Sequence, residues 1–222
     1  MIHWVHLDSA RIPGGGELRL KRRGDEFSIM LGTNELMNSR LSGSEEALAR
    51  LSIAKLAGRS APRVLIGGLG MGFTLRAALE VLGSDARVTV AELVPEVVAW
   101  ARGPMTSVFK GCLDDPRVLV LVADVGATIL EAQPAWDAIL LDVDNGPEGL
   151  SREANDSLYD PRGLARAHRA LAKGGVLAVW SQGPEPRFTK RLNAAGFSVE
   201  EVKARANAGK SGARHIIWLA TK

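Results

Sequence analysis

The feature that most constrains the fold of this sequence is a glycine-rich turn directly after a short apolar run. Arg63-Val64-Leu65-Ile66 reads as a buried strand, Gly67-Gly68-Leu69-Gly70-Met71-Gly72 follows it, and Thr74 to Leu82 has helical apolar spacing. Glycines at such a junction allow a tight turn and let backbone N–H groups approach a ligand closely. A glycine pattern alone is weak support for a binding site, so the ends of the other strands decide its meaning.

Strand and helix patterns alternate through most of the remaining chain. Apolar runs that predict further strands lie at Arg87–Ala91, Val118–Val122, Ala138–Leu141 and Val176–Trp180, and helical patterns lie at Pro95–Arg102, Pro161–Leu171 and Phe188–Ala195. Near-continuous apolar strands between helices predict an α/β fold with a mostly parallel sheet covered on both faces. Phe197–Val202 and His215–Ala220 predict an antiparallel edge at the C-terminus.

The N-terminal region has a different pattern. Glu17–Leu20 and Phe27–Leu31 flank the turn-prone Arg23-Gly24-Asp25 and predict a β-hairpin. Ser42 followed by Glu45 resembles a capping box and predicts a helix after it. We therefore expect a hairpin and linking helix over residues 1–60 and a ligand-binding domain over 61–222.

Composition narrows the class of protein. The net charge is +3 and the basic residues form local clusters, but acidic residues lie among them and aromatic residues are only 5%, so we expect no nucleic-acid partner. No apolar run approaches the roughly 20 residues of a membrane span, and the N-terminus lacks a signal-peptide pattern, which favours a cytoplasmic protein without a membrane partner. Four separated histidines and the single Cys112 predict no metal site.

The residues directly after the strands carry the candidate chemistry, because open α/β sheets bind ligands beyond the carboxyl ends of their strands. Glu92 lies 20 positions after Gly72, where an acidic residue can accept both hydrogen bonds of a ribose diol. Asp124 can contact an adenine amino group or can cap the helix that follows. A nicotinamide-dependent dehydrogenase also has a glycine turn followed by an acidic residue. Carboxylates at the ends of the next two strands, here Asp124 and Asp142, are less typical of dehydrogenases than of a methyltransferase-like sheet.

The strand that ends at Leu141 is followed by Asp142, Asp144 and Asn145, and this cluster is the predicted reaction site. Paired carboxylates can raise one pKa and so create a general base, or they can orient a cationic substrate. The alternative is an Asp-rich turn that only caps backbone amides.

Together these motifs resemble the spermidine synthase family, within the class I S-adenosylmethionine-dependent methyltransferase fold. The likeness runs from about Arg63 to Gly183 and includes the glycine turn, Gly146-Pro147 and Leu171-Ala172-Lys173-Gly174-Gly175. It implies a class I methyltransferase (Rossmann-like) sheet and a homodimer. It also implies roles for six residues: cofactor binding by Gly68, Gly70 and Gly72, ribose binding by Glu92, adenine binding by Asp124 and amine handling at Asp142.

Two segments depart from the family pattern. Aminopropyl-transferring members carry Asp-x-x-Asp and proline after the fourth strand, whereas this loop reads Asp142-Val143-Asp144-Asn145. Their N-terminal Gln and Tyr-His-Glu-like segment is replaced by Leu36-Met37-Asn38-Ser39-Arg40. We therefore expect a transferase that moves a methyl group from S-adenosylmethionine to a small-molecule acceptor, for which an amine is one candidate, with Asp142 and then Asp144 as the catalytic carboxylates. The alternatives are aminopropyl transfer from decarboxylated S-adenosylmethionine to make a polyamine, and a non-catalytic nucleoside-binding protein.

Overall fold

The computed structural model describes residues 2–131, 135–143, 147, 157–207 and 212–222. Seven strands form a mixed sheet in the order β10-β11-β9-β8-β5-β6-β7, and four form a separate antiparallel sheet in the order β1-β2-β3-β4. The strands of the larger sheet are β5 (Arg63–Gly67), β6 (Arg87–Glu92), β7 (Val118–Val122), β8 (Trp136–Leu141), β9 (Leu171–Ser181), β10 (Ser198–Arg205) and β11 (Arg214–Thr221). Strands β5 to β9 pair in parallel, whereas β11 runs antiparallel to both β9 and β10. The predicted parallel sheet with an antiparallel C-terminal edge is thus confirmed.

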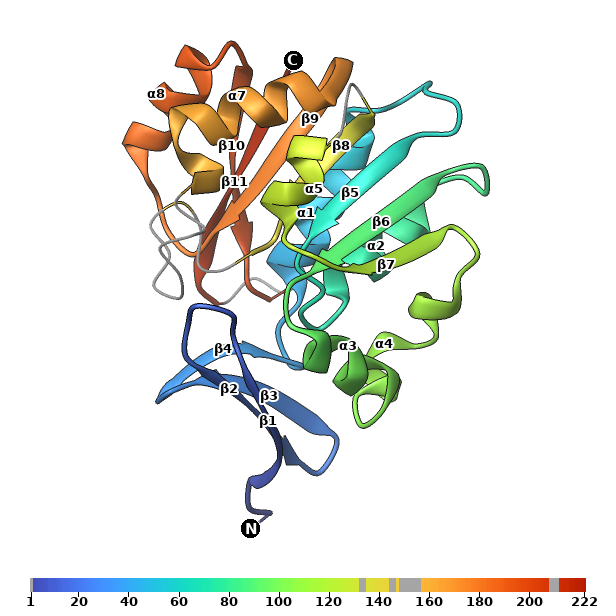
Figure 1. The fold of residues 1–222 in the computed structure, drawn as a ribbon, viewed down its shortest axis with the longest axis vertical. Helices are drawn as coiled ribbons and strands as arrows, with labels where there is room; N and C mark the ends of the chain where they lie inside the picture. The colour runs from blue at the N-terminus through green and yellow to red at the C-terminus, as the bar shows by residue number, and fades with distance from the viewer. Residues whose placement is uncertain (1, 132–134, 144–146, 148–156, 208–211) are drawn as a thin grey trace.

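Helices cover both faces of the larger sheet (Figure 1). One face packs against α1 (Gly43–Ala54), α2 (Phe73–Val81) and α3 (Pro95–Arg102), and the other against α5 (Val125–Glu131), α7 (Pro161–Ala170) and α8 (Pro186–Ala194). Successive residues of a strand alternate between these two cores: Val64 and Ile66 face the first, and Leu65 faces the second. This two-sided burial explains why the strands read as continuous apolar runs. A short helix α4 (Thr106–Phe109) and a 3-10 turn (Cys112–Asp114) lie between α3 and β7.

The N-terminal region is larger than the predicted hairpin. The hairpin itself is present as β2 (Glu17–Arg23) and β3 (Glu26–Leu31), but β1 (Val5–Arg11) and β4 (Asn34–Asn38) extend it to four strands. The prediction of a hairpin alone was incomplete because β1 is almost wholly exposed and β4 is short and polar, so neither shows a buried apolar face. Backbone pairing to β2 and β3 places them instead.

The small sheet packs against the larger domain beside α3, as Figure 1 shows for the blue strands. Leu18, Leu20, Phe27 and Ile29 are buried in the same core as the residues of α1 to α3. The indole Nε1 of Trp100 on α3 also donates a 2.7 Å hydrogen bond to Asp8 on β1. These contacts bring one face of the small sheet to the carboxyl ends of the parallel strands.

Helix α1 forms where it was predicted, but the predicted capping box is wrong. Ser42 makes no side-chain cap, and its hydroxyl contacts Glu46 Oε1 at 2.8 Å. Glu45 instead accepts a 2.7 Å hydrogen bond from Ser44 and faces the interior. None of the described helices is long and apolar enough to cross a lipid bilayer.

Candidate functional site

A cleft lies beyond the carboxyl ends of the parallel strands, beside the switch point between β5 and β8 where the strand order reverses. Five of the predicted site residues line it: Gly68, Gly70, Glu92, Asp124 and Asp142. The rest of its wall is mostly apolar. The structure therefore brings together residues that lie far apart in the sequence.

The glycines of the turn serve different purposes. Gly68 and Gly70 have φ of +85° and +49° and line the cleft, and a Cβ on Gly68 would lie 2.7 Å from the backbone oxygen of Asp142. Gly72 precedes α2, and a Cβ there would lie 2.5 Å from the ring of Phe109. Gly72 is therefore required for close packing and lines the neighbouring cavity rather than the cleft.

Glu92 is buried where β6 ends, with 8% of its surface exposed. Its Oε2 accepts the N–H of Leu69 at 2.9 Å, and its Oε1 accepts the N–H of Val94 at 2.8 Å. Burial raises the pKa of this carboxyl group, and the backbone N–H groups oppose the shift. The backbone N–H groups of Gly70 and Leu93 contribute to this opposing effect as well, and the Glu92 side chain still lines the cleft. Glu92 can thus hold the glycine turn in place and still accept hydroxyl groups of a ligand.

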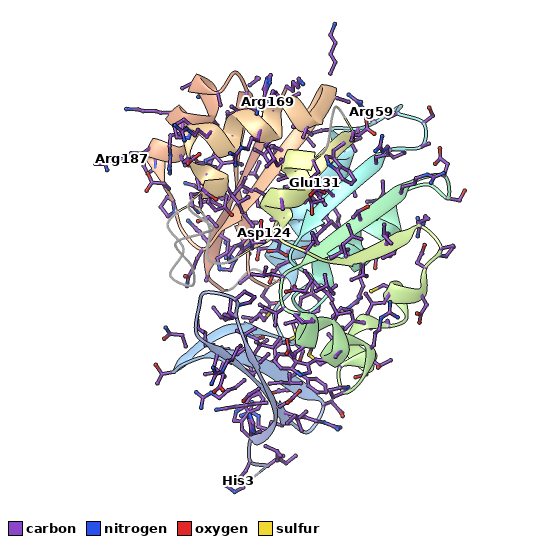
Figure 2. The ribbon with its side chains drawn as sticks, viewed as in Figure 1. His3, Arg59, Asp124, Glu131, Arg169 and Arg187 are labelled. Atoms are coloured by element: carbon purple, nitrogen blue, oxygen red, sulfur yellow. The ribbon has the colours of Figure 1, made fainter. Side chains whose placement is uncertain are left out.

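Asp124 combines the two roles that the sequence left open. Its Oδ1 accepts the N–H of Ala127 at 3.1 Å, which caps the first turn of α5, and its side chain also lines the cleft. Figure 2 shows Asp124 at the end of α5 nearer the small sheet, with Glu131 at the far end of that helix.

Asp142 follows β8, and its backbone N–H donates to the carbonyl of Gly67 at 3.0 Å. Its Oδ2 accepts a 2.5 Å hydrogen bond from the Thr74 hydroxyl on α2. Burial and the nearby charge of Glu45 raise the pKa of Asp142 to about 7, against the opposing effect of Thr74. A carboxyl group with a pKa near neutrality can both accept and release a proton in catalysis.

The partner of Asp142 differs from the predicted one. Asp144 and Asn145 lie outside the described residues, so their predicted places in the reaction site stay predictions. The carboxylate that faces Asp142 is Glu45 of α1, and burial raises its pKa too, while the Ser44 hydroxyl lowers it. Sequence reasoning missed this role because the local spacing assigned Glu45 to a helix cap.

The small sheet forms the opposite wall of the cleft, which the sequence analysis also missed. Ile12, Leu18, Ile29, Leu36 and Met37 line it. Leu36 and Met37 belong to the segment that departs from the family pattern, and here they supply apolar surface instead of polar groups. Hydrophobic walls with a few placed polar groups are typical of small-molecule sites.

Two further cavities continue from the cleft past Asp142. The first, of about 110 Å³, lies between Asp142 and Glu45 and shares Leu36, Met37 and Gly70 with the cleft. The second, of about 490 Å³, is more polar and shares Glu45 and Trp180 with the first. Its other polar lining residues are Thr33, Asn34, Glu35, Asn38, Gln182 and His215. Asp142 thus separates an apolar compartment from an acidic and polar one. Among the described residues there is no cluster of three or more side chains that could hold a metal ion.

Comparison with known proteins agrees with this geometry. No protein-family model matches the chain. The polyamine aminopropyltransferase of Mycobacterium tuberculosis is 30% identical over 195 residues, which cover 82% of this chain and 35% of that protein. The spermidine synthase of Thermotoga maritima has the same fold, with a TM-score of 0.76 at 18% identity, over 98% of this chain and 72% of that one. The chain is thus similar in sequence to an aminopropyltransferase and in fold to a spermidine synthase.

A second structural neighbour is a methyltransferase. The 1,6-didemethyltoxoflavin-N1-methyltransferase of Burkholderia thailandensis, solved with bound S-adenosylhomocysteine, is 25% identical and has a TM-score of 0.56. The match covers 82% of this chain and 79% of the methyltransferase. Among curated proteins, the chain spans about a third of the length of the aminopropyltransferases that it matches first.

Proposed function

We propose that this chain transfers an aminopropyl group from decarboxylated S-adenosylmethionine to an amine. The curated relatives are polyamine aminopropyltransferases, which favours aminopropyl transfer over the methyl transfer predicted from the sequence. Methyl transfer from S-adenosylmethionine is the second candidate, because one structural neighbour is a methyltransferase with bound S-adenosylhomocysteine.

The observation that carries the proposal is the acidic boundary formed by Asp142 and Glu45 between the cleft and the next cavity. S-adenosylmethionine has a carboxylate at the end of its amino-acid chain, and the decarboxylated form has only an ammonium group there. Like charges that lie close together in a partly buried site repel, whereas a cation is attracted. Two carboxyl groups at this boundary therefore favour the decarboxylated form and also an amine acceptor.

The nucleoside would lie in the apolar cleft. Glu92 would accept the ribose hydroxyl groups, Asp124 would lie near the adenine, and Gly68 and Gly70 would allow the turn to approach the ligand without Cβ atoms. Each of these residues lines the same cleft, so a single bound nucleoside could contact them all. This supports the predicted cofactor residues, with Gly72 contributing through the packing of α2.

The acceptor amine would approach from the side of Glu45. The sulfonium of the co-substrate supplies the leaving group, so the protein has to align the amine and remove one of its protons. Asp142 is suited to both tasks, since it faces both compartments and has a pKa of about 7.

Product analysis tests this proposal. Purified protein is incubated with a short aliphatic diamine and either decarboxylated S-adenosylmethionine or S-adenosylmethionine, and the nucleoside products are separated by chromatography. We expect diamine-dependent methylthioadenosine from the first mixture. The variant Asp142→Asn should lose at least about 100-fold in turnover, whereas Asp25→Asn, on the exposed turn between β2 and β3, should match the wild type.

Two results would contradict the proposal. S-adenosylhomocysteine formed only from the second mixture would restore methyl transfer. Binding of both nucleosides without either product would favour a non-catalytic nucleoside-binding protein.

A further inference from the structure

Three side chains next to Asp142 form a continuous hydrogen-bonded series. The Ser44 hydroxyl donates to Glu45 Oε2 at 2.7 Å, and Nδ1 of His215 lies 2.8 Å from the same hydroxyl oxygen. Ser44 is completely buried, so both contacts are shielded from competing water. Ser44 and Glu45 belong to α1 and His215 to β11, 171 residues from Ser44 in sequence.

The two ends of this series face different cavities. Glu45 lines the cavity of about 110 Å³ that also contains Asp142, which is large enough to hold water between the two carboxyl groups. His215 is half-buried and lines the polar cavity of about 490 Å³. The series thus leads from the reacting carboxyl group to a separate, polar compartment.

Trp180 holds the imidazole in this position. Its ring packs edge-on against His215, with 4.7 Å between ring centroids and an angle of 72° between the planes. Trp180 also lines both cavities. A ring packed in this way keeps Nδ1 directed at Ser44, so Nε2 is the nitrogen that can exchange a proton with water in the polar cavity.

We propose that Glu45, Ser44 and His215 conduct the proton released by the transfer reaction from Asp142 to the solvent. This inference rests on the proposed function, although it holds for aminopropyl and methyl transfer alike. Either reaction forms a bond from the acceptor to carbon, breaks a carbon–sulfur bond whose electron pair stays on sulfur, and releases one proton. Without an exit path the proton would remain on Asp142, which could not then accept the next one.

The transfer is balanced at each step. The proton moves from Asp142 through water in the shared cavity to Glu45, and protonated Glu45 donates to Ser44 Oγ while the Ser44 hydroxyl proton moves to His215 Nδ1. His215 then releases the proton on Nε2 to water, which leaves the neutral imidazole protonated on Nδ1. Transfer of that proton from Nδ1 to Nε2 through water, together with reorientation of the Ser44 hydroxyl, restores the series. Burial lowers the pKa of His215, which favours release over retention of the proton. No oxidant or reductant takes part.

Replacing His215 by Gln tests the path, because an amide can keep a hydrogen bond to Ser44 but cannot relay a proton. We expect kcat to fall about tenfold or more with little change in KM, and imidazole added to the buffer to restore much of the loss. Ser44→Ala, which breaks the series between its two ends, should lower kcat similarly without rescue by imidazole. The matched control is His168→Gln, on α7 across the sheet, which should leave kcat unchanged.

A second readout does not depend on turnover. In ¹⁵N NMR spectra, the Nδ1 signal of His215 should shift in both Ser44→Ala and Glu45→Gln, whereas the signals of His168 should stay in place. An unmoved His215 signal would overturn the series itself. If the wild type forms the transfer product and His215→Gln forms it with the same kcat, the proton path is refuted while the proposed function stands. A wild type that makes no transfer product would instead refute the proposed function and with it the role of the path.

Discussion

Replacing Asp142 by Asn should stabilise the protein increasingly as the pH rises. The pKa of Asp142 is raised from 3.8 to about 7 in the folded protein, so between these values the folded state holds a proton that the unfolded chain has lost. Stability therefore falls as the pH rises through this interval, and above pH 7 the full cost of ionising the buried carboxyl group is present. At about 1.4 kcal/mol for each pKa unit, the total is ~4 kcal/mol, and about 2 to 3 kcal/mol of it arises between pH 5 and pH 8. Asparagine keeps an oxygen for the Thr74 hydroxyl and carries no charge, so the variant escapes this cost.

The assay is urea unfolding of the wild type and Asp142→Asn at pH 5, 6, 7 and 8, with the free energy of unfolding extrapolated to water. The difference between the two proteins should grow in favour of the variant by about 2 to 3 kcal/mol across this range. Asp25→Asn, which removes an exposed carboxylate outside the cleft, is the control for any general effect of net charge. A difference between Asp142→Asn and wild type that is the same at pH 5 and pH 8 would refute the raised pKa and the catalytic argument built on it.

Three further predictions follow from the same contacts. Glu45→Gln removes the charge that helps to raise the pKa of Asp142. In the same urea series, this variant should therefore lose stability at a lower pH than the wild type does. An unchanged dependence of stability on pH would place Glu45 outside the site. Gly68→Ala should abolish nucleoside binding in calorimetry, because its Cβ would lie 2.7 Å from the backbone oxygen of Asp142. The control Gly14→Ala, also at positive φ but with no atom within 4 Å of its Cβ, should bind the nucleoside normally. Equal binding by both variants would contradict this account of the turn. Trp100→Phe removes the hydrogen bond between α3 and β1 and should lower the free energy of unfolding by about 1 kcal/mol, and no loss in urea titrations would show that this bond does not secure the small sheet.

Local patterns in the sequence were sufficient for the larger sheet. The parallel strands β5, β6, β8 and β9 have buried residues on both faces, so each appears as a short apolar run that can be recognised without knowledge of its neighbours. The edge strand β7 is also an apolar run, although its Leu119 and Val122 are exposed. The rule that ligands bind beyond the carboxyl ends of such strands then selected Glu92, Asp124 and Asp142, which do line one cleft.

Features that depend on contacts distant in sequence could not be predicted in this way. Glu45 has the spacing of a helix cap, and only its packing near Asp142, 97 positions later, reveals a different environment. Strand β1 carries exposed Val5 and Leu7 and is placed by pairing with β2, so its own sequence lacks a strand-like buried face. The small sheet was therefore predicted as a separate hairpin, although it forms a wall of the cleft.

Other expectations remain to be tested. The catalytic role of Asp144, the division of the chain into residues 1–60 and 61–222, the cytoplasmic location and the homodimer stay predictions. The roles of the cleft residues stay proposals until ligand binding is measured for the variants described above.

Calorimetric titration of the purified protein with decarboxylated S-adenosylmethionine, S-adenosylmethionine and NAD tests the account most directly. The acidic boundary of Asp142 and Glu45 predicts that the decarboxylated form binds at least about tenfold more tightly than S-adenosylmethionine, a difference of ~1.4 kcal/mol, and that NAD does not compete. Glu92→Gln should weaken the binding of both adenosyl ligands, since Glu92 lines the part of the cleft assigned to the ribose. Tighter binding of S-adenosylmethionine, or binding of NAD alone, would contradict the account.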